Sequence, residues 1–371
     1  MKKNVIFLSF LSNKSCVYLF QITNTKESLM QIRTDTRPLH AIHPIIPELL
    51  RPGDLFLDIE TTGLSRSRHR IYLIGMASVV DHNNIYVNQL FADCPEDEAV
   101  LLTRFANIMQ TTEIRRIITF NGNSFDLPFL LARAALHSVP LSFETFELFD
   151  IYKEVTRRKN MLQLQNYRQK TVEQFLGIDR EDKYSGGDLI KVYENYVRHP
   201  DEEAAQLLWL HNYEDVLGMI DLLAVFAYDE LFSSPAHVVS ASVEQYNDLE
   251  GNPSEELIAV LTPPCTLPGC LSCTQPVTGA YLHAAGDHVR LRVPLYQGMA
   301  RLYYLDYKNY YYLPAEDIAI HKSVATYVDK AHREKATPET CYSKVAVDDA
   351  FLHSEKLAEY LTHVLGGFSE S

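Results

Sequence analysis

Short, strand-like runs of mainly apolar residues recur through the first part of the chain, and this pattern predicts strands. Five such runs lie at residues 55–60, 71–80, 85–91, 117–120 and 146–151. Helical spacing follows the acids at 96–98, recurs at 128–136 and ends in a long apolar helix at 202–232. Three antiparallel strands, then helix, strand, helix and strand, predict an α/β fold with a mixed five-stranded sheet flanked by helices.

Residues 1–50 are predicted to form a strand-rich N-terminal extension. The apolar runs Asn4 to Leu11 and Val17 to Phe20 lie on either side of Ser12-Asn13-Lys14, and no Ala-x-Ala type cleavage site follows the first run. This pattern favours a hairpin over a secretory signal. No stretch approaches the ~18 apolar residues of a membrane span. We therefore expect no membrane partner and a cytoplasmic location.

The helical pattern stops near Ser233-Ser234-Pro235. Residues 233–293 include a segment rich in Pro, Gly, Ser and Cys, which predicts a linker or irregular insert. Residues 294–371 are predicted to form a small, Tyr-rich α+β unit, with a hairpin at 302–313 turning at Lys308-Asn309 and a helix from Ala315 to about Arg333. Its tyrosine stripe fits either a surface that stacks on nucleobases or the packed face of a hairpin.

Composition narrows the classes of function. With 371 residues, 46% hydrophobic and 22% charged, the chain has the composition of an ordinary globular protein. The net charge of −14 argues against a protein that coats nucleic acid electrostatically, although an enzyme could still grip a short stretch through local basic patches. Six cysteines in a chain of this length do not form a disulfide framework. Cys265, Cys270, Cys273 and Cys341 are irregularly spaced, so a structural zinc site is not expected.

Two carboxylates stand inside the first predicted strand of the sheet, in the run Leu57-Asp58-Ile59-Glu60. Side chains alternate across a strand, so Asp58 and Glu60 share one face. Adjacent like charges resist burial unless a cation lies between them. The pair therefore indicates either a divalent metal site or two solvated carboxylates on an edge strand.

Two later segments carry further acids. Asp126 precedes a predicted helix with Pro128 in its first turn, which fits either a metal ligand or an N-cap. His211 and Asp215 are four residues apart in the long helix and therefore share a face. The two residues fit either a base (His211) beside a metal ligand (Asp215) or a helix ion pair.

Together, Asp58-x-Glu60, Asn121-x3-Phe125-Asp126 and His211-x3-Asp215 resemble the three motifs of DEDD-type (DnaQ-like) 3′–5′ exonucleases. Within that superfamily, the DIETTGL run at 58–64, Tyr-Ser-Gly-Gly at 184–187 and the HN-x2-D pattern most resemble the YprB-type ribonuclease H-like domain. The resemblance implies a ribonuclease H-like exonuclease domain over residues 51–232. It also implies phosphodiester hydrolysis of DNA or RNA, with single strands or 3′ ends as partners.

The chemistry of such a reaction calls for two Mg²⁺ or Mn²⁺ ions ~3.5–4 Å apart, held by hard oxygen ligands. The four carboxylates of Asp58, Glu60, Asp126 and Asp215 suit this role, and His211 is the predicted general base. His211 departs from the family pattern, because histidine there normally lies five residues before the last Asp and tyrosine lies four before it. Tyr213 cannot replace it, because two helical residues rotate a side chain ~200°.

Substrate contacts are predicted from the motif positions and from clustered basic residues. The assigned positions are Thr61, Thr62, Asn121, Phe125, Arg66, Arg68, Lys153, Arg157 and Arg158. Each arginine is equally consistent with a solvated charged face. Two other functions stay open: a ribonuclease H-like endonuclease on structured nucleic acid, and a catalytically silent module that binds nucleic acid.

Overall fold

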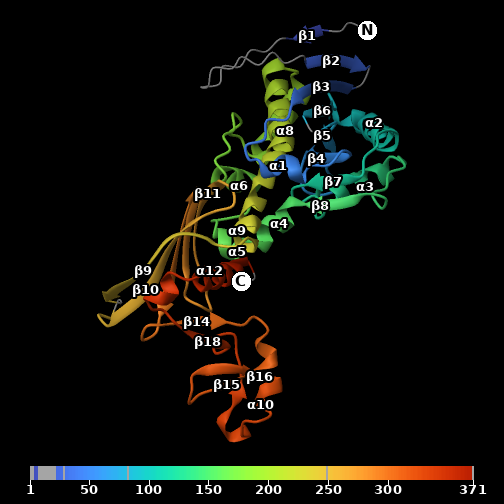
Figure 1. Ribbon diagram of the computed structural model, residues 1–371. Helices are drawn as coiled ribbons and strands as arrows, with labels where there is room; N and C mark the ends of the chain where they lie inside the picture. The colour runs from blue at the N-terminus through green and yellow to red at the C-terminus, as the bar shows by residue number, and fades with distance from the viewer. Residues whose placement is uncertain (1–3, 7–21, 28–29, 82, 248–249, 370–371) are drawn as a thin grey trace. The chain divides into compact units, whose positions relative to one another are not determined.

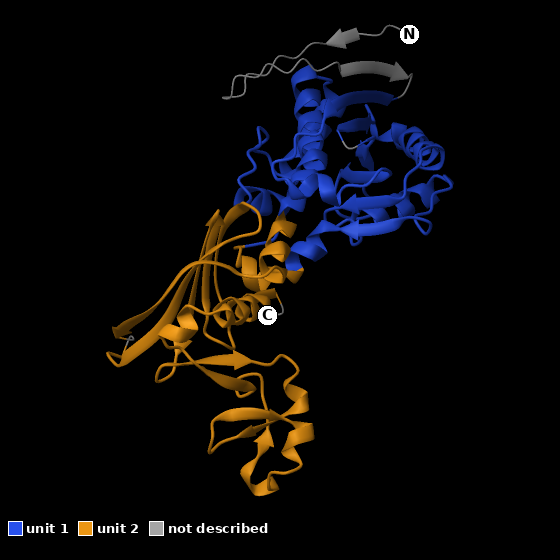
Figure 2. Ribbon diagram, viewed as in Figure 1, with its two compact units in different colours: residues 1–156, 166–224 blue, residues 157–165, 225–371 orange. Residues whose placement is uncertain are grey.

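The computed structural model describes residues 4–6, 22–27, 30–81, 83–247 and 250–369. Its chain divides into two compact units (Figure 2). Unit 1 contains residues 1–156 and 166–224, and unit 2 contains residues 157–165 and 225–371. The chain thus enters unit 2 at 157, returns to unit 1 at 166 and leaves it again after 224. The four consecutive parts predicted from the sequence, 1–50, 51–232, 233–293 and 294–371, divide the chain at other positions.

Unit 1 is built on one mixed sheet of eight strands in the order β1-β2-β3-β6-β5-β4-β7-β8. The strands are β1 (Asn4–Ile6), β2 (Ile22–Glu27), β3 (Met30–Pro38), β4 (Asp54–Thr61), β5 (Ile71–Val79), β6 (Asn84–Phe91), β7 (Arg116–Thr119) and β8 (Glu147–Asp150). Among the described strands of this sheet, only the β4–β7 and β7–β8 pairs are parallel. The predicted mixed sheet is confirmed as β4 to β8, and β1 to β3 extend it beyond β6. The predicted strand at Val17 to Phe20 lies outside the described residues.

Helices cover both faces of this sheet (Figure 1). On one face, α2 (Glu98–Thr111) and α3 (Asp126–Leu136) bury Phe105 and Phe129 against Leu57 and Ile59 of β4. On the other, α7 (Gly186–Arg198) and α8 (Glu202–Leu222) bury Tyr193 and Trp209 against β5 and β6. Since residues alternate along β4, Asp58 and Glu60 face the side covered by α8. Shorter helices are α1 (Ile45–Leu49), α4 (Ile151–Arg157), α5 (Lys159–Leu162) and α6 (Gln169–Phe175).

The predicted helix at 202–232 is interrupted. α8 ends at Leu222, the 3-10 turn Leu223–Phe226 follows, and α9 (Ala227–Ser233) belongs to unit 2. The apolar residues of α8, the 3-10 turn and α9 form one continuous helical pattern, so the sequence does not indicate where the helix is interrupted. In the part of the chain that the structure describes, no helix has the length and apolar character needed to cross a membrane.

Residues 233–293, predicted as a linker or irregular insert, instead form most of a five-stranded antiparallel sheet in the order β11-β12-β13-β10-β9. Its strands are β9 (His237–Asn247), β10 (Pro253–Thr262), β11 (Leu267–Thr274), β12 (Tyr281–Gly286) and β13 (His288–Leu295). The turn-forming residues misled the prediction because they lie between the strands, as Gly251 (φ 87°) and Gly279 (φ 69°) do. Leu257, Ala259 and Leu261 alternate on a buried face of β10.

The Tyr-rich segment also differs from the predicted hairpin and helix. β14 (Met299–Tyr303) pairs with β18 (Tyr342–Ala346), while β15 (Tyr310–Leu313) lies between β16 (Ile318–His321) and β17 (Glu334–Lys335). Two short helices, α10 (Lys322–Ala325) and α11 (Asp349–Leu352), precede the C-terminal α12 (Glu355–Ser369). The chain turns at Asp317 (φ 51°), whose carboxylate accepts hydrogen bonds from Tyr312 (2.7 Å) and Tyr342. These tyrosines are therefore packed within the fold.

Candidate metal centre and active site

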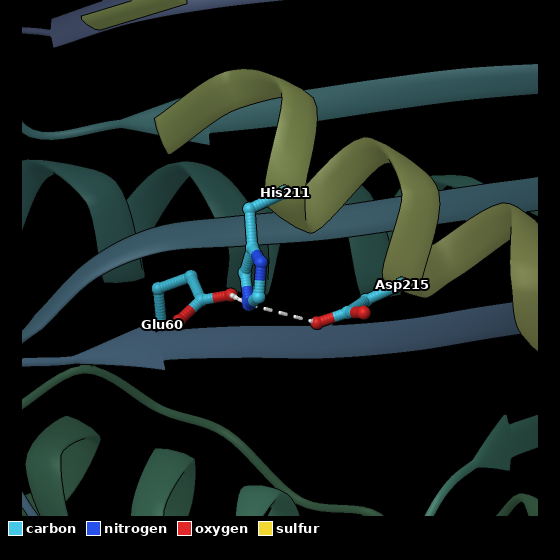
Figure 3. A group of neighbouring side chains, drawn as sticks. All are labelled: Glu60, His211 and Asp215. Atoms are coloured by element: carbon cyan, nitrogen blue, oxygen red, sulfur yellow. Dashed lines mark ion pairs between the residues drawn. The ribbon is translucent and has the colours of Figure 1, made fainter. Parts of the chain in front are cut away.

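Three elements of unit 1 bring the motif residues together. β4 carries Glu60, and α8 carries His211 and Asp215 one turn apart. The Nε2 atom of His211 lies 3.5 Å from Glu60 Oε1 and 3.2 Å from Asp215 Oδ2 (Figure 3). One potential ligand atom from each of the three residues lies within 4.8 Å of the others. This group could hold a metal ion.

Asp126 and Asp58 complete the acid cluster. α3 begins at Asp126 itself, and Phe125 precedes it without a side-chain cap, so the N-cap interpretation of Asp126 is wrong. Instead, Asp126 Oδ1 accepts a hydrogen bond from the Ile59 amide of β4 (3.2 Å). Asp58 Oδ2 accepts one from Asn212 Nδ2 on α8 (2.8 Å). The four predicted acids thus meet between β4, α3 and α8.

The clustered charges oppose one another. Burial, with Glu60, Asp215 and Asp126, raises the pKa of Asp58 well above its usual value. Burial also raises the pKa of Glu60 to about 7, although His211 works in the opposite direction. Burial raises the pKa of Asp126 to about 7 against the effect of its backbone hydrogen bonds. A site that keeps these carboxylates together fits divalent cations, which prefer hard oxygen donors.

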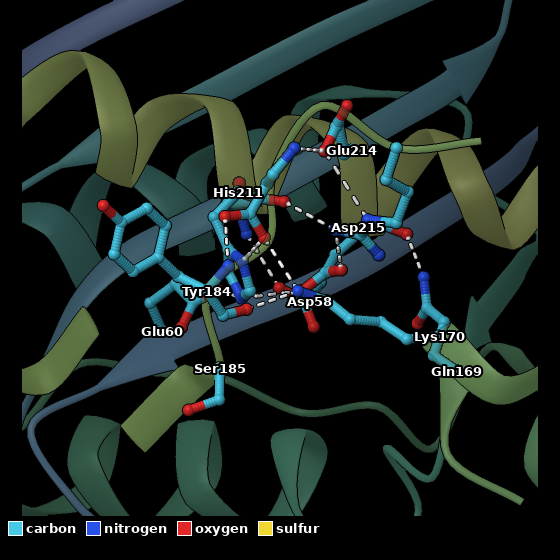
Figure 4. A network of polar contacts seen from close by, with 12 residues as sticks. Asp58, Glu60, Gln169, Lys170, Tyr184, Ser185, His211, Glu214 and Asp215 are labelled. Atoms are coloured by element: carbon cyan, nitrogen blue, oxygen red, sulfur yellow. Dashed lines mark hydrogen bonds and ion pairs between the residues drawn. The ribbon is translucent and has the colours of Figure 1, made fainter. Parts of the chain in front are cut away.

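The second ring nitrogen of His211, Nδ1, is bonded to a further acid, Asp182. Its Nδ1 atom lies 2.6 Å from Asp182 Oδ2, and the same oxygen lies 2.8 Å from Lys170 Nζ. Figure 4 shows Lys170, His211 and Asp215 in this network. Burial by itself lowers the pKa of His211, but Asp215, Glu60 and Asp182 together raise it above its ordinary value. Burial likewise opposes the charge of Asp182, yet hydrogen bonds from Lys170 and His211 leave its pKa lowered.

Sequence reasoning missed three residues of this site: Asp182, Arg180 and Asn212. Arg180 NH2 lies 2.5 Å from Asp215 Oδ1, and its NH1 lies 3.0 Å from Glu173 Oε2. Asp182 and Arg180 belong to the loop between α6 and α7, and no spacing rule joins that loop to the motifs. One sequence signal could have indicated Asn212. A glycine stands at position 75 within the buried strand β5, and its missing side chain makes room for that of Asn212.

Tyr213 points to a different part of unit 1. Its hydroxyl donates a hydrogen bond to Asp35 Oδ2 on β3 (2.7 Å) and accepts one from Arg37 (3.3 Å). This position agrees with the rotation argument that separates it from Asp215.

The predicted substrate contacts fall into different environments. Thr61 donates to the Gly63 carbonyl, and Thr62 accepts from the Arg70 amide, so both hydroxyls shape the turn after β4. Arg66 and Arg68 are exposed on that turn, and Arg66 donates to the Ser124 carbonyl (2.7 Å). Leu64, which the sequence did not single out, is 82% exposed beside them.

The other predicted contacts are spread over both units. Asn121 adopts a left-handed conformation (φ 63°) with its amide bonded to Asp150, and Phe125 packs on Phe129. Lys153 lies on α4 within unit 1. Arg157 and Arg158 belong to unit 2, where Arg158 is paired with Asp229 (2.9 Å) and lies over Phe226. The structure therefore does not bring all the predicted basic residues together in unit 1.

A mixed sheet of this order, with acids on the face covered by its long helix, defines an RNase H-like α/β protein. A family model described as RNase_H superfamily matches residues 55–227. Uncharacterized protein MJ0365 of Methanocaldococcus jannaschii is 31% identical over 170 residues, which cover 43% of this chain and 87% of that protein. The chain belongs to the RNase H superfamily.

Other relatives share only part of their length with this chain. Uncharacterized protein YprB of Bacillus subtilis is 28% identical over 174 residues, or 45% of this chain and 40% of YprB. Among solved structures, a family B DNA polymerase from Pyrobaculum calidifontis is 14% identical with a TM-score of 0.39, covering 62% of this chain and 29% of the polymerase. Exonuclease I of E. coli with a dT13 oligonucleotide is 14% identical with a TM-score of 0.33, covering 57% of this chain and 55% of the exonuclease.

Proposed function

We propose that this protein is a divalent-metal-dependent 3′–5′ exonuclease that hydrolyses phosphodiester bonds of DNA or RNA. The observation that supports it most is the convergence of four buried or half-buried carboxylates and one histidine between β4, α3 and α8. Such a set is costly to keep together unless it binds cations. RNase H superfamily membership agrees with this chemistry without specifying the substrate.

Asp58, Glu60, Asp126 and Asp215 would hold the ions, and Mg²⁺ and Mn²⁺ match these oxygen donors. When bound, such ions supply a nucleophile at neutral pH and stabilise the charge that develops on the phosphate. His211 Nε2 faces Glu60 and Asp215 and would take the proton of the attacking water. Asn212 orients the Asp58 carboxylate by donating to its Oδ2.

The turn after β4 has side chains suited to binding a nucleic-acid strand. Leu64 presents an exposed apolar side chain directly after two threonines and a glycine, and Arg66 and Arg68 follow it on the surface. An apolar residue can contact a base face while arginines contact phosphates, which together suit an unpaired strand.

The test uses 5′-labelled single-stranded DNA and RNA with Mn²⁺ or Mg²⁺. We expect stepwise shortening that stops when the 3′ end is chemically blocked and is lost in Asp58→Asn. Cutting that continues on blocked ends would replace the exonuclease with an endonuclease. Binding without cleavage under every metal condition would favour a silent nucleic-acid-binding module.

A further inference from the structure

The loop at residues 178–185, between α6 and α7, places one side chain directly beneath His211. Asp182 is the residue concerned, and its side chain has 0% exposure. Its Oδ2 atom lies 2.6 Å from His211 Nδ1 and 2.8 Å from Lys170 Nζ, while its Oδ1 accepts from the Tyr184 amide at 2.9 Å. Both carboxylate oxygens are therefore in use, and each partner is a nitrogen that can donate.

Groups other than the His211 side chain also hold this loop in place. The backbone amides of Glu181 and Asp182 donate to the two oxygens of Glu214, at 2.8 and 2.9 Å. Arg180 is bonded to Glu173 and Asp215. Because Glu214 and Asp215 stand on α8, the loop is fixed to the helix that carries His211. Asp182 is thus held in place before any ligand arrives.

An ionised carboxylate can only accept hydrogen bonds. Asp182 therefore favours the form of neutral His211 that carries its proton on Nδ1, which leaves the lone pair on Nε2. That nitrogen faces Glu60 and Asp215. Without such a partner, an imidazole in water favours the opposite tautomer, with the proton on Nε2.

We propose that Asp182 is the positioning residue of His211, which fixes the ring and keeps Nε2 free to accept a proton. This role rests on the proposed nuclease function. It also accounts for the unusual spacing of His211. A histidine four residues before Asp215 rather than five starts from a helix position rotated by ~100°, so its ring needs a support of its own.

The first test reads the tautomer directly in metal-free protein without substrate. Long-range ¹H–¹⁵N spectra of histidine-labelled protein are recorded at a pH where His211 is neutral, and its signals are identified among the 14 histidines by their loss in His211→Gln. We expect the Nδ1–H form in the wild type and a shift towards the Nε2–H form in Asp182→Asn and Asp182→Ala. Asp179→Asn, an exposed residue of the same loop, should leave the spectrum unchanged. An Nε2–H tautomer in the wild type would overturn the proposal, even if the variants fail to fold.

The second test separates positioning from folding and binding. Asp182→Asn should lower kcat on the order of 10²- to 10⁴-fold, which is the usual range for loss of acid–base catalysis. Its KM should stay within about twofold, because the Asp182 side chain bonds to His211, Lys170 and the Tyr184 amide and not to the exposed turn. A variant with wild-type kcat would refute the role. A wild type without nuclease activity would refute the proposed function instead, and the tautomer would remain readable.

Discussion

At the residue scale, the site holds like-charged carboxyl groups close to one another and to the imidazole of His211. The alternation along β4 places Asp58 and Glu60 on the face covered by α8, as expected for a strand. Asp182 could not be predicted in this way. Its contact with His211 joins a loop to α8, and its place two residues before the Tyr-Ser-Gly-Gly motif at 184–187 does not indicate that contact. Long-range partners of this kind require the fold.

The stability of the metal-free protein should fall as pH rises. The carboxyl groups of Glu60 and Asp126 have pKa values of about 7 in the folded state, against ~4 in an unfolded chain. Between these values the folded state binds more protons than the unfolded state, so the free energy of unfolding decreases with pH. The raised pKa of His211 acts in the same direction just above pH ~6.5.

Thermal unfolding between about pH 4 and 8 in the presence of a chelator measures this effect, and Asp58→Asn should make the decline shallower because it removes one like charge. Added Mn²⁺ should raise the melting temperature of the wild type more at pH 8 than at pH 5. An identical decline in wild type and variant would contradict the assignment of these acids to one cluster.

Leu64 offers a second prediction at this scale. Leu64→Ala should raise KM about threefold to tenfold with little change in kcat, equivalent to roughly 1 kcal/mol of lost apolar contact with the strand. Leu136→Ala is the matched control, since Leu136 is also an exposed leucine (61%) but lies at the end of α3. Steady-state kinetics on a labelled single strand would show the difference. Equal effects of both substitutions would argue against contact at Leu64.

At the element scale, regular sheet and helix patterns were predictable, while interrupted ones were not. The strands β4 to β8 follow the apolar runs closely. The sheet β9 to β13 was not predicted, because the Pro, Gly, Ser and Cys residues of this region indicate irregular structure. The apolar run from Leu257 to Leu261 nevertheless forms part of β10, with Leu257, Ile258 and Ala259 all buried. The Tyr-rich segment was misjudged because β14 pairs with β18, about 40 residues along the chain, rather than with its neighbour.

The packing of α8 on β5 can be tested at Gly75. A Cβ atom at this position would lie 2.0 Å from Asn212 Oδ1, so the side chain that orients Asp58 would have to move. Gly75→Ala should destabilise the protein by roughly 1–3 kcal/mol and lower nuclease activity. Chemical denaturation and the exonuclease assay measure the two effects.

Gly187→Ala is the control for this substitution. Gly187 lies in the first turn of α7, where an added Cβ would come no closer than 3.8 Å, to Ser185 Oγ. Its stability should be unchanged or raised by up to ~1 kcal/mol, because alanine favours helix. If Gly75→Ala proved equally neutral, Asn212 would not be held over β5 as described.

At the scale of the whole molecule, the chain crosses between the two units more than once. Residues 157–165 belong to unit 2, and α5 within them buries Met161 and Leu162, each 5% exposed. Arg158 in the same segment is paired with Asp229. The sequence predicted consecutive domains because it gave no sign that a nine-residue segment inside the first domain folds with the second.

A fragment that ends at residue 232 should therefore expose apolar surface. We expect it to bind a hydrophobic dye more strongly and to melt at a lower temperature than the full chain, because α5 loses its sheet. Replacing Met161 and Leu162 by Gln in the fragment should reduce dye binding, whereas the same replacement in the full chain should destabilise it. A fragment as stable as the full chain would show that α5 does not need the strands of unit 2.

This crossing has a consequence for synthesis on the ribosome. The last acid of the proposed site, Asp215, emerges well before β11, the strand that contacts α5. Nascent chains at that stage can assemble the acid cluster while the side chains of Met161 and Leu162 are still exposed, because β11 has not yet been made. Slow translation beyond residue 225 would prolong this interval, in which the exposed apolar residues of segment 157–165 favour aggregation. The rate at which the C-terminal strands are made thus bears on the yield of folded protein.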